Sequence, residues 1–467
     1  MAKASRPALS GIKVLDMTTV IAGPYASALL SDMGAAVIKI ESADGIGDSY
    51  RFAGSARIFP STVIRAPTLP PPPTSMHTAN PPLISLRAQG EVMGASFATA
   101  NRNKRSIALD CKSEQGRAVL LRLVAQSDVF VQNMRPGVAE RLGIGYASLR
   151  AANPSLIYVS ISGFGSSGPL SGDPVYDPLV QARSGIVATQ ARIGDAGRTG
   201  HNPVSTLVNS IIVDKTTAMT VAQAVTAALY TRDVRGAGGQ HIEVSMLDVA
   251  MQFNWPDLFV DHVFGAEDKR LPLMKKELLV QEGYAVFPCK GSRSVVFSAN
   301  AGVLVEHKWQ AICTGLQLPQ LLSDPRFAKP GHRMRNLRDI FRAFDTATLQ
   351  MEVEEVEALF RSVDVGVAPV LSVAESLEQP QVKHCGNVLE VGQGSKVGMF
   401  RQARAAALFS HTEAVIPGPP PLYAEHGREI LVEAGFSEAE VAALERQNSV
   451  GLPRAPRKQT PPGKSKL

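Results

Sequence analysis

The chain has 467 residues, of which 45% are hydrophobic and 19% are charged, so it can bury large cores and is neither a peptide nor a single small binding module. Its 48 lysines and arginines outnumber its 42 acidic residues, which gives a formal net charge of +6 without any dense basic block. This balance suits a phosphate-bearing small ligand and argues against nucleic acid, which usually requires a basic stripe.

The N-terminal segment is predicted to form a strand, a helix and a second strand. Residues 13–20 are apolar and β-rich, residues 22–24 (Ala-Gly-Pro) break the strand, residues 25–33 are helical, and residues 36–40 again favour a strand. The turn after the first strand lacks G-x-G-x-x-G, so the sequence carries no dinucleotide-binding fingerprint.

A second unit of the same kind follows. Residues 113–126 predict a helix, residues 128–132 a buried strand and residues 156–162 a further strand. Helices and strands that alternate at this spacing indicate a parallel sheet in an α/β layer. Between the two units, residues 58–91 are so rich in proline that they can join neither a helix nor a central strand, and we interpret them as an exposed insertion without function.

The middle of the chain indicates a change of domain. A long helix is predicted over residues 215–231, followed by a glycine-rich turn over 236–239 and a strand over 240–246. Residues 252–385 mix shorter helices and strands, which is typical of a second, smaller domain. The residues after 451 are basic and rich in proline, so we expect them to be disordered.

Asp214 directly precedes the long predicted helix. Its position alone indicates an N-cap whose carboxylate accepts backbone N–H bonds. A carboxylate at a helix N-terminus also stays ionised and is held rigidly, as a carboxylate nucleophile must be. The two interpretations are compatible.

Three other segments place turns or cations near predicted strand ends. The glycine-rich turn 162–169 has backbone amides that can bind anionic oxygens, and Tyr176 and Asp177 follow it. The basic segment 101–105 is, by itself, typical of a solvated loop. Residues 133–137 (Asn-Met-Arg-Pro-Gly) are better placed for a phosphate, because open α/β sheets bind ligands beyond the carboxyl ends of their strands.

The cysteines and the hydropathy pattern exclude several classes of protein. The four cysteines have no C-x-x-C spacing, so they indicate neither a zinc site nor a disulfide framework, and we expect a reducing compartment. No apolar run approaches the ~18 residues that span a bilayer, and the N-terminus lacks the apolar core of a secretory signal. We therefore expect a soluble protein without a metal site or a membrane partner.

A series of short motifs, taken in order, resembles the class III CoA-transferase family, which includes formyl-CoA and carnitine CoA-transferases and, as a branch, the α-methylacyl-CoA racemases. The resemblance covers about residues 9–435, and so many ordered motifs make it specific. The motifs are Gly11-Ile-Lys-Val-Leu-Asp, Ala22-Gly-Pro, Gly34-Ala-Ala-Val-Ile-Lys-Ile-Glu41, Asn101-Arg-Asn-Lys-Arg-Ser-Ile-Ala-Leu-Asp110, Asn133-Met-Arg-Pro-Gly137, Ser162-Gly-Phe-Gly165, Tyr176-Asp177, Asp214-Lys-Thr-Thr217 and Gly239-Gln-His-Ile-Glu-Val244.

The resemblance implies an α/β fold with a Rossmann-like large domain that binds CoA, a smaller α+β middle domain, and a homodimer of two chains threaded through each other as interlocked rings. The expected division is a first part of the large domain over 1–230 with the 58–91 insertion, the middle domain with its linkers over 231–390, a return to the large domain over 391–450, and the tail over 451–467.

The resemblance also assigns site residues. Asp214 matches the family's nucleophile, and Arg135 and Arg141 are the strongest CoA contacts because guanidinium groups suit phosphates. Leu109 stays open as a core residue instead. The CoA contacts carried over are Val20, Ile21, Leu109, Lys112, Asn133, Met134, Arg135 and Arg141, and the supporting residues are Gly163, Gly165, Tyr176 and Asp177.

The implied reaction moves CoA from an acyl-CoA donor to a small carboxylic acid through an aspartyl anhydride and an aspartyl-CoA thioester on Asp214. Donors in the 163–168 turn would stabilise the oxyanion, at roughly 3 to 4 kcal/mol for each well-placed donor. Acyl-CoA is a substrate, and no metal, redox group or other tightly bound cofactor is required. The family's glycine-rich middle-domain loop is reduced here to residues 290–293, so shielding of the intermediate and the acyl specificity stay open.

Two alternatives remain. A 2-methylacyl-CoA racemase needs an acid/base group on each side of the α-carbon, and its branch has a histidine where this chain has Tyr176, a poor base at neutral pH with a reference pKa near ~10. The second alternative is a catalytically silent CoA-binding protein, although the retained Asp214 argues against it.

The last residues, 465–467 (Ser-Lys-Leu), match the peroxisomal import tripeptide, which a receptor reads at an accessible C-terminus. We therefore expect binding to the import receptor and a peroxisomal location in a eukaryotic host, and a cytoplasmic location otherwise.

Overall fold

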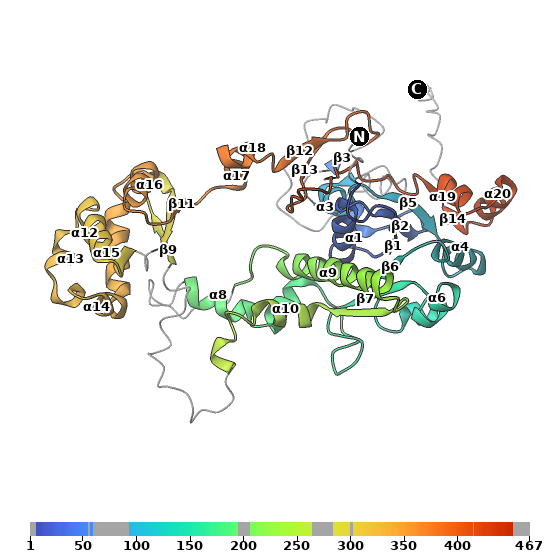
Figure 1. Cartoon of the computed structure of the whole chain (residues 1–467), viewed down its shortest axis with the longest axis horizontal. Coiled ribbons are helices and arrows are strands. Elements are labelled where there is room, and N and C mark those ends of the chain that lie inside the picture. Colours follow the sequence, from blue (N-terminus) through green and yellow to red (C-terminus); the bar gives the residue numbers. More distant parts are fainter. Residues whose placement is uncertain are drawn as a thin grey trace, which may run out of the picture. The chain divides into compact units, whose positions relative to one another are not determined.

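The computed structural model describes residues 6–54, 57–58, 93–194, 206–263, 284–298, 302–413 and 415–451. Most of the proline-rich insertion and the tail with its Ser-Lys-Leu end lie outside the described residues. The chain divides into two compact units (Figure 1). The first comprises Met1–Ile186, Leu207–Asp257 and Gly386–Leu467, and the second comprises Val187–Thr206 and Leu258–Cys385.

The first unit contains a seven-stranded sheet. Six of its strands, from β5 to β8 in the sheet order, run parallel, as the alternation of helices and strands predicted. The last strand, β14, pairs antiparallel with β5 at one edge. The strand order is β14 (Val450–Gly451), β5 (Arg105–Leu109), β2 (Ala36–Ser42), β1 (Lys13–Met17), β6 (Val129–Gln132), β7 (Ile157–Ser162) and β8 (His241–Ser245).

Helices cover both faces of this sheet (Figure 1). Neighbouring strand residues point to opposite faces, so Leu15 of β1 packs into one core and Val14 into the other. The Leu15 core is closed by α4 (Glu114–Val124), α6 (Tyr146–Ala152), α19 (Gly427–Glu433) and α20 (Glu438–Arg446). The Val14 core is closed by α1 (Ala22–Asp32) and α9 (Ile212–Arg235).

Two predicted element boundaries near the N-terminus are wrong by three residues each. Strand β1 ends at Met17 instead of residue 20, because Val20 has a positive φ of 72° that no strand residue adopts. Helix α1 begins at Ala22, so the predicted break at 22–24 forms its first turn, with Pro24 tolerated there.

The predicted domain boundary near residue 230 is placed too early. Strand β8 pairs with β7 over residues 158–162, and it is followed by α10 (Met246–Asn254), so both belong to the first unit, which continues to Asp257. The parallel partner of β8 lies some 80 residues away in the sequence, as in the Tyr158–His241 pair, and local periodicity does not reveal it.

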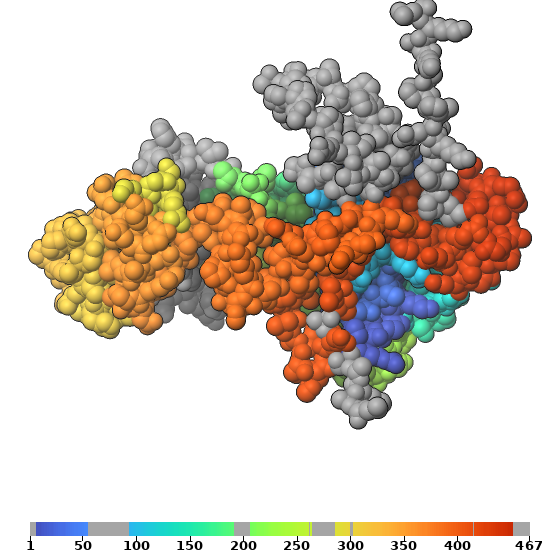
Figure 2. Space-filling view, turned by 90° about the horizontal axis from the view of Figure 1, so that it is seen from above, coloured from blue at the N-terminus to red at the C-terminus, as the bar shows by residue number. Residues whose placement is uncertain are grey.

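The C-terminal part of the chain lies against the N-terminal strands of the first unit, and Figure 2 shows these orange and red residues beside the blue and cyan ones. The Tyr423 hydroxyl donates to Ser42 O at 2.8 Å, Arg51 Nη1 donates to Pro421 O at 3.1 Å, and His426 N donates to Ser106 O at 2.9 Å. Residues far apart in sequence therefore complete one sheet and its loops.

The second unit is a small α+β fold. Its antiparallel sheet has the order β11 (Val367–Pro369), β10 (Ser294–Ser298), β9 (Tyr284–Pro288). Phe297 of β10 stacks between Phe287 and Phe360, with ring centroids 4.0 and 3.9 Å away, and anchors the core. Its helices are α12 (Glu306–Gly315), α13 (Pro319–Ser323), α14 (Pro330–Arg335), α15 (Leu337–Thr348), α16 (Val353–Ser362), α17 (Val373–Glu378) and α18 (Pro380–His384), with η2 (Val260–His262), η5 (Lys290–Ser292) and η6 (Pro325–Phe327).

The remaining elements are short. They are η1 (Ser49–Phe52), β3 (Arg57–Ile58), β4 (Met93–Gly94), α3 (Ala95–Ala100), α5 (Val138–Arg141), α7 (Asp177–Arg183), α8 (Ile186–Gly194), β12 (Val388–Val391) and β13 (Phe400–Ala403). Within the described ranges, no helix is both long and apolar enough to cross a membrane.

Candidate active site

Asp214 lies in the first turn of α9, and it is not the N-cap that the sequence predicted. The N-cap residue is Ile211, whose side chain cannot accept a hydrogen bond. The carboxylate of Asp177 takes over this role, since its Oδ2 accepts from Val213 N at 2.7 Å and from Asp214 N at 2.9 Å. A residue from another helix thus fixes the backbone that carries Asp214.

Asp177 is itself held firmly. It is 2% exposed, at the start of α7, and its Oδ1 accepts from Gln181 Nε2 at 2.5 Å, one turn further along that helix. Gln181 also donates to Ser210 O at 3.1 Å and accepts from Val208 N at 3.0 Å, which ties α7 to the segment that leads into α9. Sequence reasoning missed Gln181, although its i, i+4 spacing from Asp177 was visible.

The surroundings of Asp214 disfavour its charged form. Burial, and then the negative charge of Asp177, raise the pKa of Asp214 from 3.8 to about 7. These two effects act against the ionised state that the helix N-terminus alone predicted. A carboxyl group with a pKa near neutral is a better nucleophile than an ordinary aspartate, and groups perturbed this strongly are common at functional sites.

Tyr50 lies within electrostatic reach of this carboxyl group. The pKa of the Tyr50 phenol is raised by burial and then by the charges of Asp214 and Asp48, so the phenol keeps its proton at neutral pH and can donate a hydrogen bond. Tyr176, the predicted supporting residue, is 66% exposed. Tyr50 was missed because neither its neighbours nor its spacing follow a recognisable pattern.

In the glycine-rich turn after β7, the backbone of Gly163 lies close to the Val175 side chain. A Cβ on Gly163 would lie 2.4 Å from the Val175 side chain, so only glycine fits there. Gly165 has a φ of 97°, and its N–H donates to Ser162 Oγ at 3.1 Å. The Gly165 amide is therefore already engaged, and it is not a free oxyanion donor.

Several predicted CoA contacts meet at the carboxyl edge of the sheet. Strands β1 and β6 are parallel neighbours, so the turns that follow them are adjacent. Asn133 Oδ1 accepts from Thr19 N at 3.0 Å, and Asn133 Nδ2 donates to Thr19 O at 2.9 Å. These bonds bring the Val20–Ile21 turn against the 133–135 loop, where Met134 N donates to Gln132 Oε1 at 2.7 Å.

Arg135 and Arg141 are exposed beside the same loop. Arg141 Nη1 lies 3.1 Å from the place of a Cβ on Gly137, so this guanidinium folds back over the start of α5. In the described part of the chain, neither guanidinium has a carboxylate partner. Both are thus available to an anionic group at this edge.

The last two predicted CoA contacts, Leu109 and Lys112, differ in burial. Leu109 is buried in the main core and pairs with Val450, so its side chain serves packing, which is the alternative that the sequence left open. Lys112 is exposed beyond the end of β5. Among the residues that the structure describes, no three His, Cys, Asp or Glu side chains come together to hold a metal ion.

The basic segment 101–105 is not a solvated loop, contrary to expectation. Lys104 is buried with its Nζ 2.8 Å from Asp16 Oδ2, and Arg102 is buried in an ion pair with Asp32. Each cation has a carboxylate partner on β1 or α1 that is distant in sequence, so composition alone could not reveal it.

Comparisons with known proteins identify the family of the chain. The profile described as CoA-transferase family III matches residues 9–427. The chain is 32% identical to acetyl-CoA:oxalate CoA-transferase of Acetobacter aceti, covering 79% of this chain and 82% of that protein, and 29% identical to succinate–glutarate CoA-transferase of Agrobacterium fabrum, covering 92% and 96%. A crystal structure of a CAIB/BAIF family protein from Brucella suis matches with a TM-score of 0.71 at 26% identity, covering 92% of this chain and all of that one. The chain therefore belongs to the class III CoA-transferase family, and it is a CoA-transferase by that membership.

Proposed function

We propose that the protein moves CoA from an acyl-CoA donor to a small dicarboxylic acid through covalent intermediates on Asp214. The observation that carries the proposal is the Asp214 carboxyl group, whose pKa is raised to about 7 and whose backbone is fixed by Asp177. The named relatives act on oxalate, succinate and glutarate, which supports a dicarboxylate as the acceptor.

The reaction proceeds by four substitutions at carbonyl carbon. A carboxylate oxygen of Asp214 attacks the donor thioester, the C–S bond breaks, and a mixed anhydride and CoA thiolate form. The thiolate then attacks the Asp214 carbonyl carbon of the anhydride, which releases the donor acid and leaves an aspartyl-CoA thioester. The acceptor carboxylate attacks that thioester to give a second anhydride, and the thiolate attacks the acceptor carbonyl carbon, which frees Asp214. No net proton or electron is consumed.

The first test separates CoA transfer from racemisation. In D2O, with acetyl-CoA or succinyl-CoA as donor, we expect oxalate or glutarate to become CoA thioesters with kcat/KM at least tenfold above that for the monocarboxylic acid propionate as acceptor. A 2-methylacyl-CoA should keep its α-proton, because this chain has Tyr176 in place of the histidine that the racemase branch uses as a base. Mass spectrometry of the CoA esters measures both. Rapid α-deuterium uptake without acceptor-dependent thioester formation would instead identify a racemase.

The arginines beside the 133–135 loop should bind the CoA phosphates. Replacing either Arg135 or Arg141 with Ala should raise KM for the acyl-CoA about tenfold, with kcat changed much less, because a phosphate contact binds the ground state and the transition state alike. The matched control is Arg446→Ala on α20, which removes an exposed arginine elsewhere in the same unit. Equal effects of all three substitutions would contradict the assignment.

We further propose the interlocked homodimer that the resemblance implies. Large apolar side chains around the start of α9 are exposed in the single chain, and a second copy would cover them. They are Tyr176 at 66%, Leu179 at 48%, Leu207 at 50% and Ile211 at 37%. Light scattering should give twice the chain mass of 49.8 kDa, and Leu207→Asp should weaken the dimer. A monomeric mass for the active protein would refute this.

A further inference from the structure

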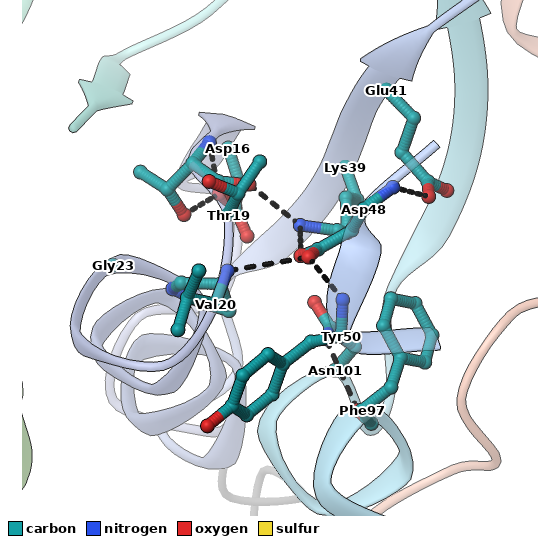
Figure 3. A network of polar contacts seen from close by, with 12 residues as sticks. Asp16, Thr19, Val20, Gly23, Lys39, Glu41, Asp48, Tyr50, Phe97 and Asn101 are labelled. Atoms are coloured by element: carbon teal, nitrogen blue, oxygen red, sulfur yellow. Dashed lines mark hydrogen bonds and ion pairs between the residues drawn. The ribbon is translucent and has the colours of Figure 1, made fainter. Parts of the chain in front are cut away.

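A network of buried charges lies beside the turn that links β1 to α1 (Figure 3). Lys39 on β2 and Asp48 before η1 form an ion pair, with Lys39 Nζ 3.1 Å from Asp48 Oδ2 and both side chains fully buried. Asp16 and Lys104 form a second buried pair next to it. Buried charges are costly unless they are paired, so such an arrangement needs an explanation beyond packing.

Asp48 holds a strained residue. Val20 has a φ of 72°, a left-handed conformation that is a genuine outlier for a β-branched residue. The N–H of Val20 donates to Asp48 Oδ1 at 3.2 Å, as Figure 3 shows. This bond compensates for a conformation that the valine would not adopt by itself.

The residues just before Val20 are fixed in the same way. Lys39 Nζ donates to Thr18 O at 2.8 Å, and Asn133 bonds to both backbone groups of Thr19. Three side chains from three separate elements therefore define the course of this turn. A turn held at so many points is preorganised before any ligand arrives.

The same carboxylate also positions Tyr50. Asp48 Oδ1 accepts from Tyr50 N at 3.0 Å as the side-chain cap of η1. In Figure 3 the Tyr50 ring turns away from Lys39 and Asp48, and its hydroxyl lies below Val20. The Tyr50 hydroxyl makes no hydrogen bond within the described residues, and its pKa is raised by burial and by the charge of Asp214. Asp48 thus joins the Val20 turn to a phenol that feels the charge of the proposed nucleophile.

Lys39 is held as the cationic partner of Asp48 in this ion pair. Burial alone would lower the pKa of Lys39, but the charges of Asp48, Asp16 and Glu41 outweigh it and raise this pKa. Asp48 N in turn donates to Glu41 Oε2 at 3.1 Å, and Glu41 is paired with Arg51. The backbone and the side chain of Asp48 are therefore both fixed.

We propose that Asp48, paired with Lys39, is a positioning residue of the active site: it sets the Val20 turn and the Tyr50 phenol in fixed places relative to each other, so that the thioester end of the acyl-CoA meets a preformed surface beside Asp214. This rests on the proposed function, in which the Val20–Ile21 turn contacts CoA and Asp214 is the nucleophile.

The test replaces the ion pair with apolar residues of similar size. In Lys39→Met/Asp48→Leu, no buried charge is left unpaired, so the thermal midpoint should stay within a few degrees of the parent value. With the turn no longer held, kcat/KM for the acyl-CoA should fall at least tenfold. The control is Asp32→Leu/Arg102→Met, which removes another buried pair, at the opposite end of α1, and should leave kcat/KM within twofold of the parent value.

A second substitution keeps the proposal testable if the double variant folds poorly. Glycine adopts a positive φ freely, so Val20→Gly should raise kcat/KM of the Asp48→Asn variant at least threefold without changing its thermal midpoint by more than a few degrees. A purely structural role would not give this rescue. A stable double variant with kcat/KM within twofold of the parent, or no rescue by Val20→Gly, would overturn the proposal. The kcat/KM of the double variant and the rescue by Val20→Gly do not depend on which residue carries the intermediate. Failure of the proposed function would instead show as an unmodified Asp214 in the parent protein.

Discussion

Replacing Asp214 with Asn should lower kcat for CoA transfer by about a thousandfold or more, with the fold intact. The amide is nearly the same size, but it cannot attack a thioester, and removing a covalent nucleophile has an effect of this order or larger. Steady-state assays with the preferred donor and acceptor measure the loss. The control is Asp173→Asn, an exposed aspartate in the loop before α7, which should keep parental activity.

The same Asp214→Asn variant should be more stable than the parent at pH 8. The native pKa of Asp214, about 7, lies above the unfolded value near 3.8, so the native protein binds more protons between these pH values and loses stability as the pH rises through them. A rise of this size corresponds to about 4 kcal/mol for a fully buried group, and we expect about 2 kcal/mol because Asp214 is only partly buried. Urea unfolding at pH 4 and pH 8 should show the gain only at the higher pH.

Equal stability of the variant and the parent at both pH values would contradict the perturbed pKa, and near-normal turnover would contradict the nucleophile assignment. The two results are independent. A variant that gains stability but keeps its activity would identify Asp214 as an unfavourable buried acid with no part in catalysis.

Replacing Asp177 with Asn should lower kcat about 10- to 100-fold while KM for the acyl-CoA changes little. Asp177 acts through the backbone, because it fixes the N–H groups of Val213 and Asp214, and a neutral amide accepts such bonds less strongly than a carboxylate. Small misplacements of a reacting group cause losses of this size.

The pH profile distinguishes this positioning role from a loss of stability. Removing the like charge of Asp177 should lower the pKa of Asp214, so the rise of kcat with pH should shift to lower pH in Asp177→Asn. A general structural defect would reduce kcat without moving the profile. An unshifted profile with reduced kcat would therefore exclude the electrostatic coupling between the two aspartates.

Local sequence patterns predicted the parallel sheet because its strands are buried on both faces and appear as short apolar runs between helices. The same patterns misplaced features whose partners are distant in sequence. Asp177 lies 37 positions before Asp214, so the cap of α9 was assigned to Asp214 itself. The sequence predicts β8 in the middle domain for the same reason, because only its pairing with β7 shows that it belongs to the large sheet.

The largest difference between sequence prediction and structure concerns buried charged side chains. Lys104 and Arg102 appear in a polar segment that is typical of a solvated loop, but each has a buried carboxylate partner, Asp16 or Asp32. Sequence patterns did not single out Tyr50 and Asp48, because the role proposed for them follows from what they contact and not from their residue type. The resemblance named the loops that meet at the carboxyl edge of the sheet, and the structure adds the side chains that fix those loops in place.

Mass spectrometry of the peptide that contains Asp214 shows directly whether this carboxylate carries the covalent intermediate. The parent protein is incubated with its acyl-CoA donor without acceptor and then treated with hydroxylamine, which converts an aspartyl anhydride or aspartyl-CoA thioester to a hydroxamate. We predict a hydroxamate on Asp214 in the parent protein, and none in the absence of donor or in Asp214→Asn. An unmodified Asp214 during full turnover, or a hydroxamate on a different carboxylate, would contradict the assignment of Asp214 as the nucleophile.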